Sequence, residues 1–89
     1  MAQKVHTLKI WKHWYSEVQS GRMTFQVRDT TDRVFQAGDI LELQAWDTIR
    51  GEFAQGYAPL YVNVVGVYNL PGLQPGYVGL SIEPTGVQV

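Results

Sequence analysis

Five stretches of the chain have the pattern of short β-strands. In residues 23–28 and 40–46, apolar and polar side chains alternate with a period of two, as in a strand with one buried face. Residues 4–10 mix apolar, polar and β-branched positions, residues 61–68 are the most β-prone stretch, and residues 77–82 follow two Pro-Gly pairs. These stretches predict five strands separated by short turns.

A helical period interrupts the strands once. Trp11, Trp14, Tyr15 and Val18 have the spacing of one helix face, and Gly21 can take the left-handed cap that follows a helix. This predicts a helix of about two and a half turns, with Trp14 and Val18 plugging one end of a barrel. The order β-α-β-β-β-β indicates the α+β class, mainly β: a small barrel of five to six strands with one short helix after the first strand.

Composition narrows the functional classes. The 89 residues are expected to form one domain, 1–89, and 45% hydrophobic with 17% charged residues is ordinary globular composition. The chain has no cysteine and only two histidines, which excludes disulfides and thiolate zinc sites, and we predict no metal and no cofactor. Without a long apolar run or a secretory signal, we expect a cytoplasmic protein with no membrane partner.

The charge is distributed unevenly along a chain whose formal net charge is −1. Residues 1–33 contain six Lys or Arg against three Asp or Glu, whereas residues 34–89 contain one against five. Such asymmetry indicates a basic face.

The strand at residues 23–28 carries the main site candidate. Its polar face presents Thr24, Gln26 and Arg28, which together would form a shelf rich in hydrogen-bond donors. An arginine can grip phosphate with two bonds or stack on a base, and an amide can read a base edge. The other interpretation of Arg28 is a structural salt bridge to Asp32 or Asp39.

Further basic and aromatic residues could extend this shelf. Lys9, Lys12, Arg22 and Arg33 are either a phosphate-binding patch or ordinary solvated charge. Trp11, Trp14, Tyr15 and Trp46 are candidates for stacking on unpaired bases, with core packing as the alternative. Helical spacing favours the core for Trp14 and Val18, whereas Trp11 and Trp46, at strand ends, are better placed to line a cleft. His6 is expected to form a hydrogen bond inside the fold, and Asp39 to serve as a turn or cap residue.

Several segments together resemble a known family. They are His-Thr-Leu-Lys-Ile at 6–10, residues 20–28, residues 32–39 running on to Trp46-Asp47, and Gly-Tyr-Val-x-Leu at 76–80. They are similar to the ASCH domains of the PUA-like superfamily, most closely to the short stand-alone domain of unknown function 3850 of bacteria and phages. The resemblance covers nearly the whole chain. It implies a PUA-like β-barrel whose cleft meets RNA or a nucleobase-like ligand.

The resemblance also raises the question of catalysis. Some relatives in the wider family are amidohydrolases on acylated cytidine that use a lysine, a threonine and a glutamate. The lysine aligns with Met23 and the threonine with Gln26, and Gln26 also replaces the usual glutamate beside Arg28. Neither replacement can act as a base or nucleophile, and the loss of the carboxylate leaves Arg28 freer to bind an anion.

The sequence therefore predicts a binding module without catalytic residues. Its ligand would be single-stranded or structured RNA, a nucleotide or a modified nucleobase. The alternatives are an amidohydrolase on an acylated or modified cytidine, and a small adaptor that binds a protein partner. The predicted ligand-binding residues are Lys9, Trp11, Arg22, Thr24, Gln26, Arg28 and Trp46.

Overall fold

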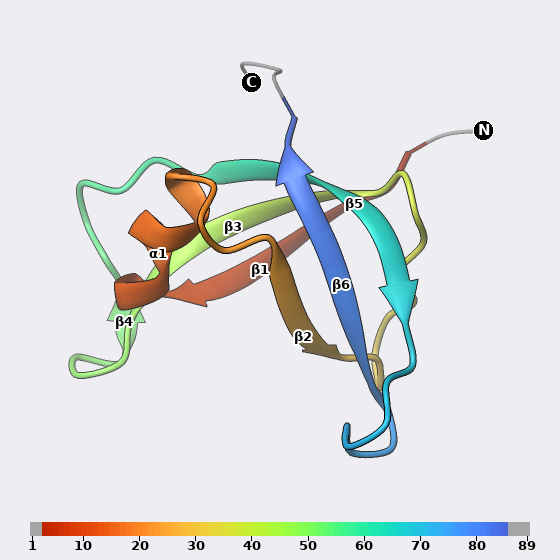
Figure 1. The fold of residues 1–89 in the computed structure, drawn as a ribbon. Helices are drawn as coiled ribbons and strands as arrows, with labels where there is room; N and C mark the ends of the chain where they lie inside the picture. The colour runs from red at the N-terminus through yellow and green to blue at the C-terminus, as the bar shows by residue number, and fades with distance from the viewer. Residues whose placement is uncertain (1–2, 86–89) are drawn as a thin grey trace.

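Six strands and one helix make up the part of the chain that the computed structural model describes, residues 3–85. In chain order they are β1 Val5–Trp11, α1 Lys12–Gln19, β2 Phe25–Asp29, β3 Ile40–Asp47, β4 Glu52–Phe53, β5 Leu60–Tyr68 and β6 Tyr77–Pro84. The strands form one curled sheet in the order β1-β3-β5-β6-β2, with β4 attached to β3 beside this path (Figure 1). The mainly β half-barrel and the single helix after the first strand confirm the predicted fold class.

The barrel is open along one side. β1 pairs with β3 in parallel and β2 pairs with β6 antiparallel, but β1 and β2, at the two ends of the path, do not pair with each other. Main-chain groups point alternately to the two sides of a strand. The Ile40 N–H of β3 donates to the Lys4 carbonyl, and the Ile82 N–H of β6 donates to the Thr24 carbonyl. Counting every second residue from Lys4 and from Thr24 gives the main-chain groups that face the neighbouring strand, and the residues between them face the other way. The main-chain groups of Lys9, Phe25 and Val27 therefore face the open side, which we call the seam.

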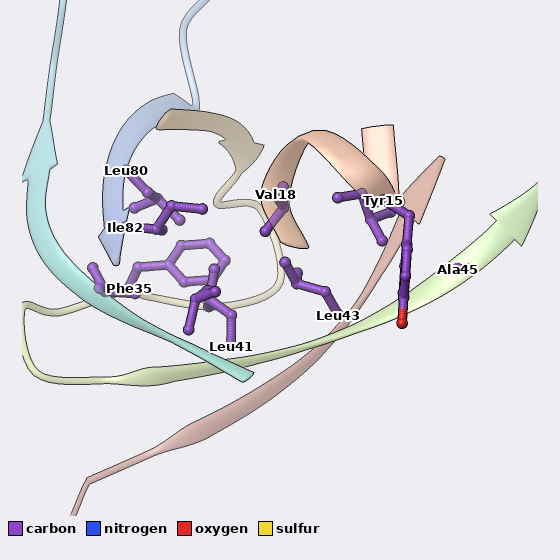
Figure 2. Close-up of a cluster of buried hydrophobic side chains, with 11 residues drawn as sticks. Tyr15, Val18, Phe35, Leu41, Leu43, Ala45, Leu80 and Ile82 are labelled. Carbon is purple, nitrogen blue, oxygen red and sulfur yellow. The ribbon is translucent and has the colours of Figure 1, made fainter. Parts of the chain in front are cut away.

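The core fills the concave side of the sheet. Leu41, Leu43 and Leu80 are fully buried, and two elements outside the sheet complete the packing. Phe35, from the loop between β2 and β3, lies beside Leu41 and Ile82, and Val18 of α1 points toward Leu43 (Figure 2). The core therefore depends on the helix and on one loop phenylalanine as well as on the strands.

The helix buries only part of the face that its spacing predicts. Tyr15 and Val18 are its buried residues, whereas Trp14 is 41% exposed. The Tyr15 hydroxyl also donates a hydrogen bond to the Ala58 carbonyl at 2.6 Å, which ties the helix to the segment before β5. Of the two residues predicted to plug the barrel end, Val18 is buried as predicted, but the prediction for Trp14 is wrong. The helix is only eight residues long, and Tyr15 and Val18 are its residues that face the core.

A buried side-chain hydrogen bond ties β1 to the start of β3. His6 Nε2 lies 2.8 Å from Asp39 Oδ2, and both side chains are more than nine-tenths buried. The same carboxylate accepts the main-chain N–H of Gln36, and the Asp39 carbonyl accepts that of Val64 in β5. Burial alone would raise the pKa of Asp39. The hydrogen bonds from the His6 side chain and from the main-chain N–H groups of Gln36 and Lys4 lower this pKa below its ordinary value of 3.8. The expected internal hydrogen bond of His6 is confirmed.

Asp39→Asn is expected to lower the free energy of unfolding at pH 7 by about 1–3 kcal/mol, because it removes a buried carboxylate that accepts several hydrogen bonds. A depressed folded pKa adds stability above the unfolded value that is lost as the pH falls through the folded value. Below about pH 4 the wild type should therefore lose stability more steeply than the variant. Urea unfolding at pH 7 and at about pH 3 measures this. The exposed Asp32→Asn is the control, and equal acid slopes for wild type and Asp39→Asn would contradict the assignment.

Candidate functional site

A groove with a volume of about 350 Å³ lies along the seam. Residues of β1 form one wall, residues on and just before β2 form the other, and α1 contributes a tryptophan. The lining residues are Lys9, Ile10, Trp11, Trp14, Met23, Phe25, Gln26, Val27 and Arg28. The groove therefore exists because β1 and β2 do not pair.

The two faces of β2 are arranged with polar side chains inside and apolar ones outside. Gln26 is 8% exposed, whereas Phe25 and Val27 are 39% and 46% exposed. Phe25 lies across Gly79 of β6, where an added Cβ would collide with the phenylalanine ring. Gln26 and Arg28 lie side by side as the shelf prediction required, but they point toward the barrel interior at the seam. Because the inner face of β2 borders an opening instead of the closed core, polar residues are tolerated there.

Arg28 spans the seam without a carboxylate partner. Its Nη1 donates to the Lys9 carbonyl of β1 at 3.0 Å, its Nη2 donates to Gln26 Oε1, and its buried Nε has no partner among residues 3–85. None of the ion pairs among residues 3–85 includes Arg28, since Asp39 pairs with His6 and Asp32 with Arg33. The predicted alternative of a salt bridge to Asp32 or Asp39 is therefore wrong. Burial, followed by the charge of Arg33, lowers the pKa of Arg28.

Most of the other basic side chains lie against a carboxylate or an aromatic ring. Arg22 lies 2.9 Å from Glu17, Lys12 lies 3.5 Å from Asp47, and Arg33 lies 3.8 Å from Asp32. The Lys9 ammonium lies 3.8 Å from the centroid of the Trp46 ring, which makes a cation–π contact. The uneven charge of the sequence therefore does not give a continuous basic patch, and the positive charge at the groove itself belongs to Arg28 with Lys9 beside it.

Four of the seven predicted ligand-binding residues line the groove: Lys9, Trp11, Gln26 and Arg28. Arg22 lies outside it because Glu17 holds its guanidinium, and Thr24 is exposed before β2. Trp46 lies on the outer face of β3, packed edge-on against Phe53. The placement of Arg22, Thr24 and Trp46 in one cleft with the others is thus corrected.

The sequence reasoning missed much of the apolar lining. Phe25, Val27 and Ile10 are absent from the predicted ligand-binding residues, and Trp14 was expected in the core. Alternation along β2 separated its polar face from its apolar face, but it implied a buried apolar face, whereas Gln26 is buried and Phe25 and Val27 are exposed. It also gave no sign that both faces border the same opening. That depends on β1 and β2 ending up on opposite edges of one sheet.

The comparison with known protein families matches residues 5–82 to the family described as Domain of unknown function (DUF3850). The chain belongs to this family. No curated protein matches it. Between residues 3 and 85 no helix of this DUF3850 domain is long and apolar enough to cross a membrane.

The polar side chains that line the groove of the DUF3850 domain are Lys9, Gln26 and Arg28. Its lining contains no carboxylate, histidine or hydroxyl side chain. Gln26 Nε2 donates to the Met23 sulfur at 4.0 Å, a long contact to a weak acceptor. Within residues 3–85, no three His, Cys, Asp or Glu side chains gather where they could hold a metal ion. The side-chain nitrogens at the seam therefore favour a ligand rich in acceptors, such as a phosphate or a carbonyl edge.

Arg28→Met is expected to change the free energy of unfolding by less than about 1 kcal/mol, since the two lost hydrogen bonds are offset by removal of a desolvated, unpaired charge. An arginine retained for the fold would behave differently, and its loss would cost about 3 kcal/mol or more. Urea unfolding of wild type and variant distinguishes these outcomes, with Asp39→Asn as the comparison for a buried structural group. A large loss of stability in Arg28→Met would contradict a ligand-binding role.

Proposed function

We propose that the DUF3850 domain is a binding module that holds RNA or a nucleotide in the seam groove, as a member of the ASCH branch of the PUA-like superfamily. The segments that resemble ASCH domains and the curled half-barrel support the assignment to that branch. A cytoplasmic location is part of the proposal, and the absence of cysteine supports it.

The observation that carries the proposal is the unpaired charge of Arg28. Burying a cation without a counterion costs free energy, and buried charges in proteins are normally paired. Arg28 is partly buried; among residues 3–85 its partners are a main-chain carbonyl and an amide oxygen but no anion, and its Nε has no partner there. A bound phosphate or an acceptor edge of a base would supply the missing partner through charge-assisted hydrogen bonds.

The shape and chemistry of the walls fit a base or nucleotide. The volume of about 350 Å³ falls in the range of small-ligand sites. Trp11 and Trp14 are both partly exposed and line the groove, so that a flat ring can stack against an indole. The Gln26 amide nitrogen can donate to a base carbonyl. Hydrolysis of an acylated cytidine is not part of the proposal, because Met23 and Gln26 supply no general base.

The test measures binding of a panel of ribonucleoside monophosphates and single-stranded RNA hexamers by isothermal titration calorimetry and tryptophan fluorescence. Arg28→Met is expected to weaken binding about tenfold or more, because a charge-assisted hydrogen bond is worth about 1.5–3 kcal/mol. For RNA, the slope of the logarithm of the binding constant against the logarithm of the salt concentration should decrease by the contribution of about one phosphate contact. Arg50→Met removes the same charge away from the groove and should bind like wild type.

Two results would overturn the proposal. One is the absence of binding to every member of the panel. The other is binding that Arg28→Met leaves unchanged, which would show that the ligand lies elsewhere. A pull-down partner that survives high salt and nuclease treatment, together with no nucleotide binding, would support a protein adaptor instead.

A further inference from the structure

Three aromatic side chains form a row on the outer face of the sheet, which we call the aromatic strip: Trp11 of β1, Trp46 of β3 and Phe53 of β4. Trp11 and Trp46 are partners in the parallel β1–β3 register, and Trp46 and Phe53 are partners in the antiparallel β3–β4 register. Partner residues project from the same face of a sheet. Ile10 and Ala45, one position earlier on their strands, are buried in the core, so the strip faces outward.

The two ends of the aromatic strip are open to solvent and its centre carries a cation. Trp11 is 54% exposed and Phe53 is 48% exposed. Between them, the Lys9 ammonium lies over Trp46, at 3.8 Å from its centroid, and 5.9 Å from that of Phe53. Phe53 packs edge-on against Trp46 at 4.9 Å. The order across the strands is thus an exposed ring, a cation held on a second ring, and another exposed ring.

The aromatic strip is continuous with the groove. Trp11 belongs to both, since it lines the groove and begins the strip, and the carbonyl of Lys9 accepts a hydrogen bond from Arg28. A ligand that leaves the groove past Trp11 therefore meets the Lys9 ammonium and then Phe53. Successive residues of the strip lie on neighbouring strands, which are about 4.8 Å apart.

We propose that the ligand of this domain is a single strand of nucleic acid that extends from the groove across the aromatic strip. Bases stack on Trp11 and Phe53, and the Lys9 ammonium contacts the phosphate between them. The inference rests on the proposed function of the groove and adds to it a second contact surface and a minimum ligand length. Alternating rings and cations are the arrangement by which proteins hold unpaired strands, because every base has a face for stacking and every linkage carries a charge.

The test compares the affinities of wild type for oligonucleotides of one, two, three and four residues, by isothermal titration calorimetry, with RNA and DNA series in parallel. Affinity is expected to rise with length up to about three residues. Phe53→Leu keeps an apolar side chain but removes the ring, so it should weaken trimer binding about tenfold and leave mononucleotide binding unchanged. Tyr68→Leu is the matched control, because it removes a similarly exposed ring from β5, which does not contribute to the strip.

The outcomes separate this inference from the groove proposal. If mononucleotides bind but affinity does not grow with length, or if Phe53→Leu behaves like Tyr68→Leu, the strip is not a binding surface although the groove still is. If trimers bind in a manner that depends on Phe53 but not on Arg28, the groove proposal fails and the strip stands. A duplex long enough to stay paired should bind more weakly than a single strand of the same length, because paired bases have no free face, and equal binding would overturn the inference.

Discussion

The parallel pairing of β1 with β3 determines where everything else lies. A parallel pair cannot be joined by a tight turn, so the chain must cross over before it returns, and here the crossover contains α1 and β2. β2 then joins β6 at the far end of the path, which leaves β1 and β2 as the two edges of a half-barrel. The open seam, the groove within it and the position of α1 beside that groove all follow from this one pairing.

The sequence predicted the elements well because their signals are local. Alternation located the strands, helical spacing located α1, and the Gln26–Arg28 pair was correctly placed on one face of one strand. Features that depend on which strands pair, and in which register, could not be predicted from local patterns. Nothing near Trp46 in the sequence shows that Lys9 covers its ring, and β4, with two residues, is too short for any period. The burial of Tyr15 instead of Trp14 depends on how α1 meets the sheet, which its own spacing leaves open.

The domain has two inward-facing polar centres that differ in their partners. His6 and Asp39 are buried and are bonded to each other and to main-chain groups, so that they join β1, a loop and β5 into one unit. Arg28 is only partly buried, and within residues 3–85 its acceptors are neutral. Buried groups whose hydrogen bonds are all made cost a fold little, whereas a charge without a counterion lowers its stability. Arg28 therefore differs from His6 and Asp39 in that its charge has no counterion within residues 3–85.

The open seam also bears on how the domain remains a separate molecule. Two unpaired strand edges, flanked by the exposed apolar side chains of Phe25 and Val27, form a template onto which a strand of another chain could add. A charged side chain that points inward at an edge is one of the devices by which natural sheets resist such addition. Because its guanidinium bonds the Lys9 carbonyl, Arg28 occupies a main-chain acceptor that an incoming strand would need. The Arg28 bond thus leaves the β1 edge with one main-chain acceptor fewer for an added strand.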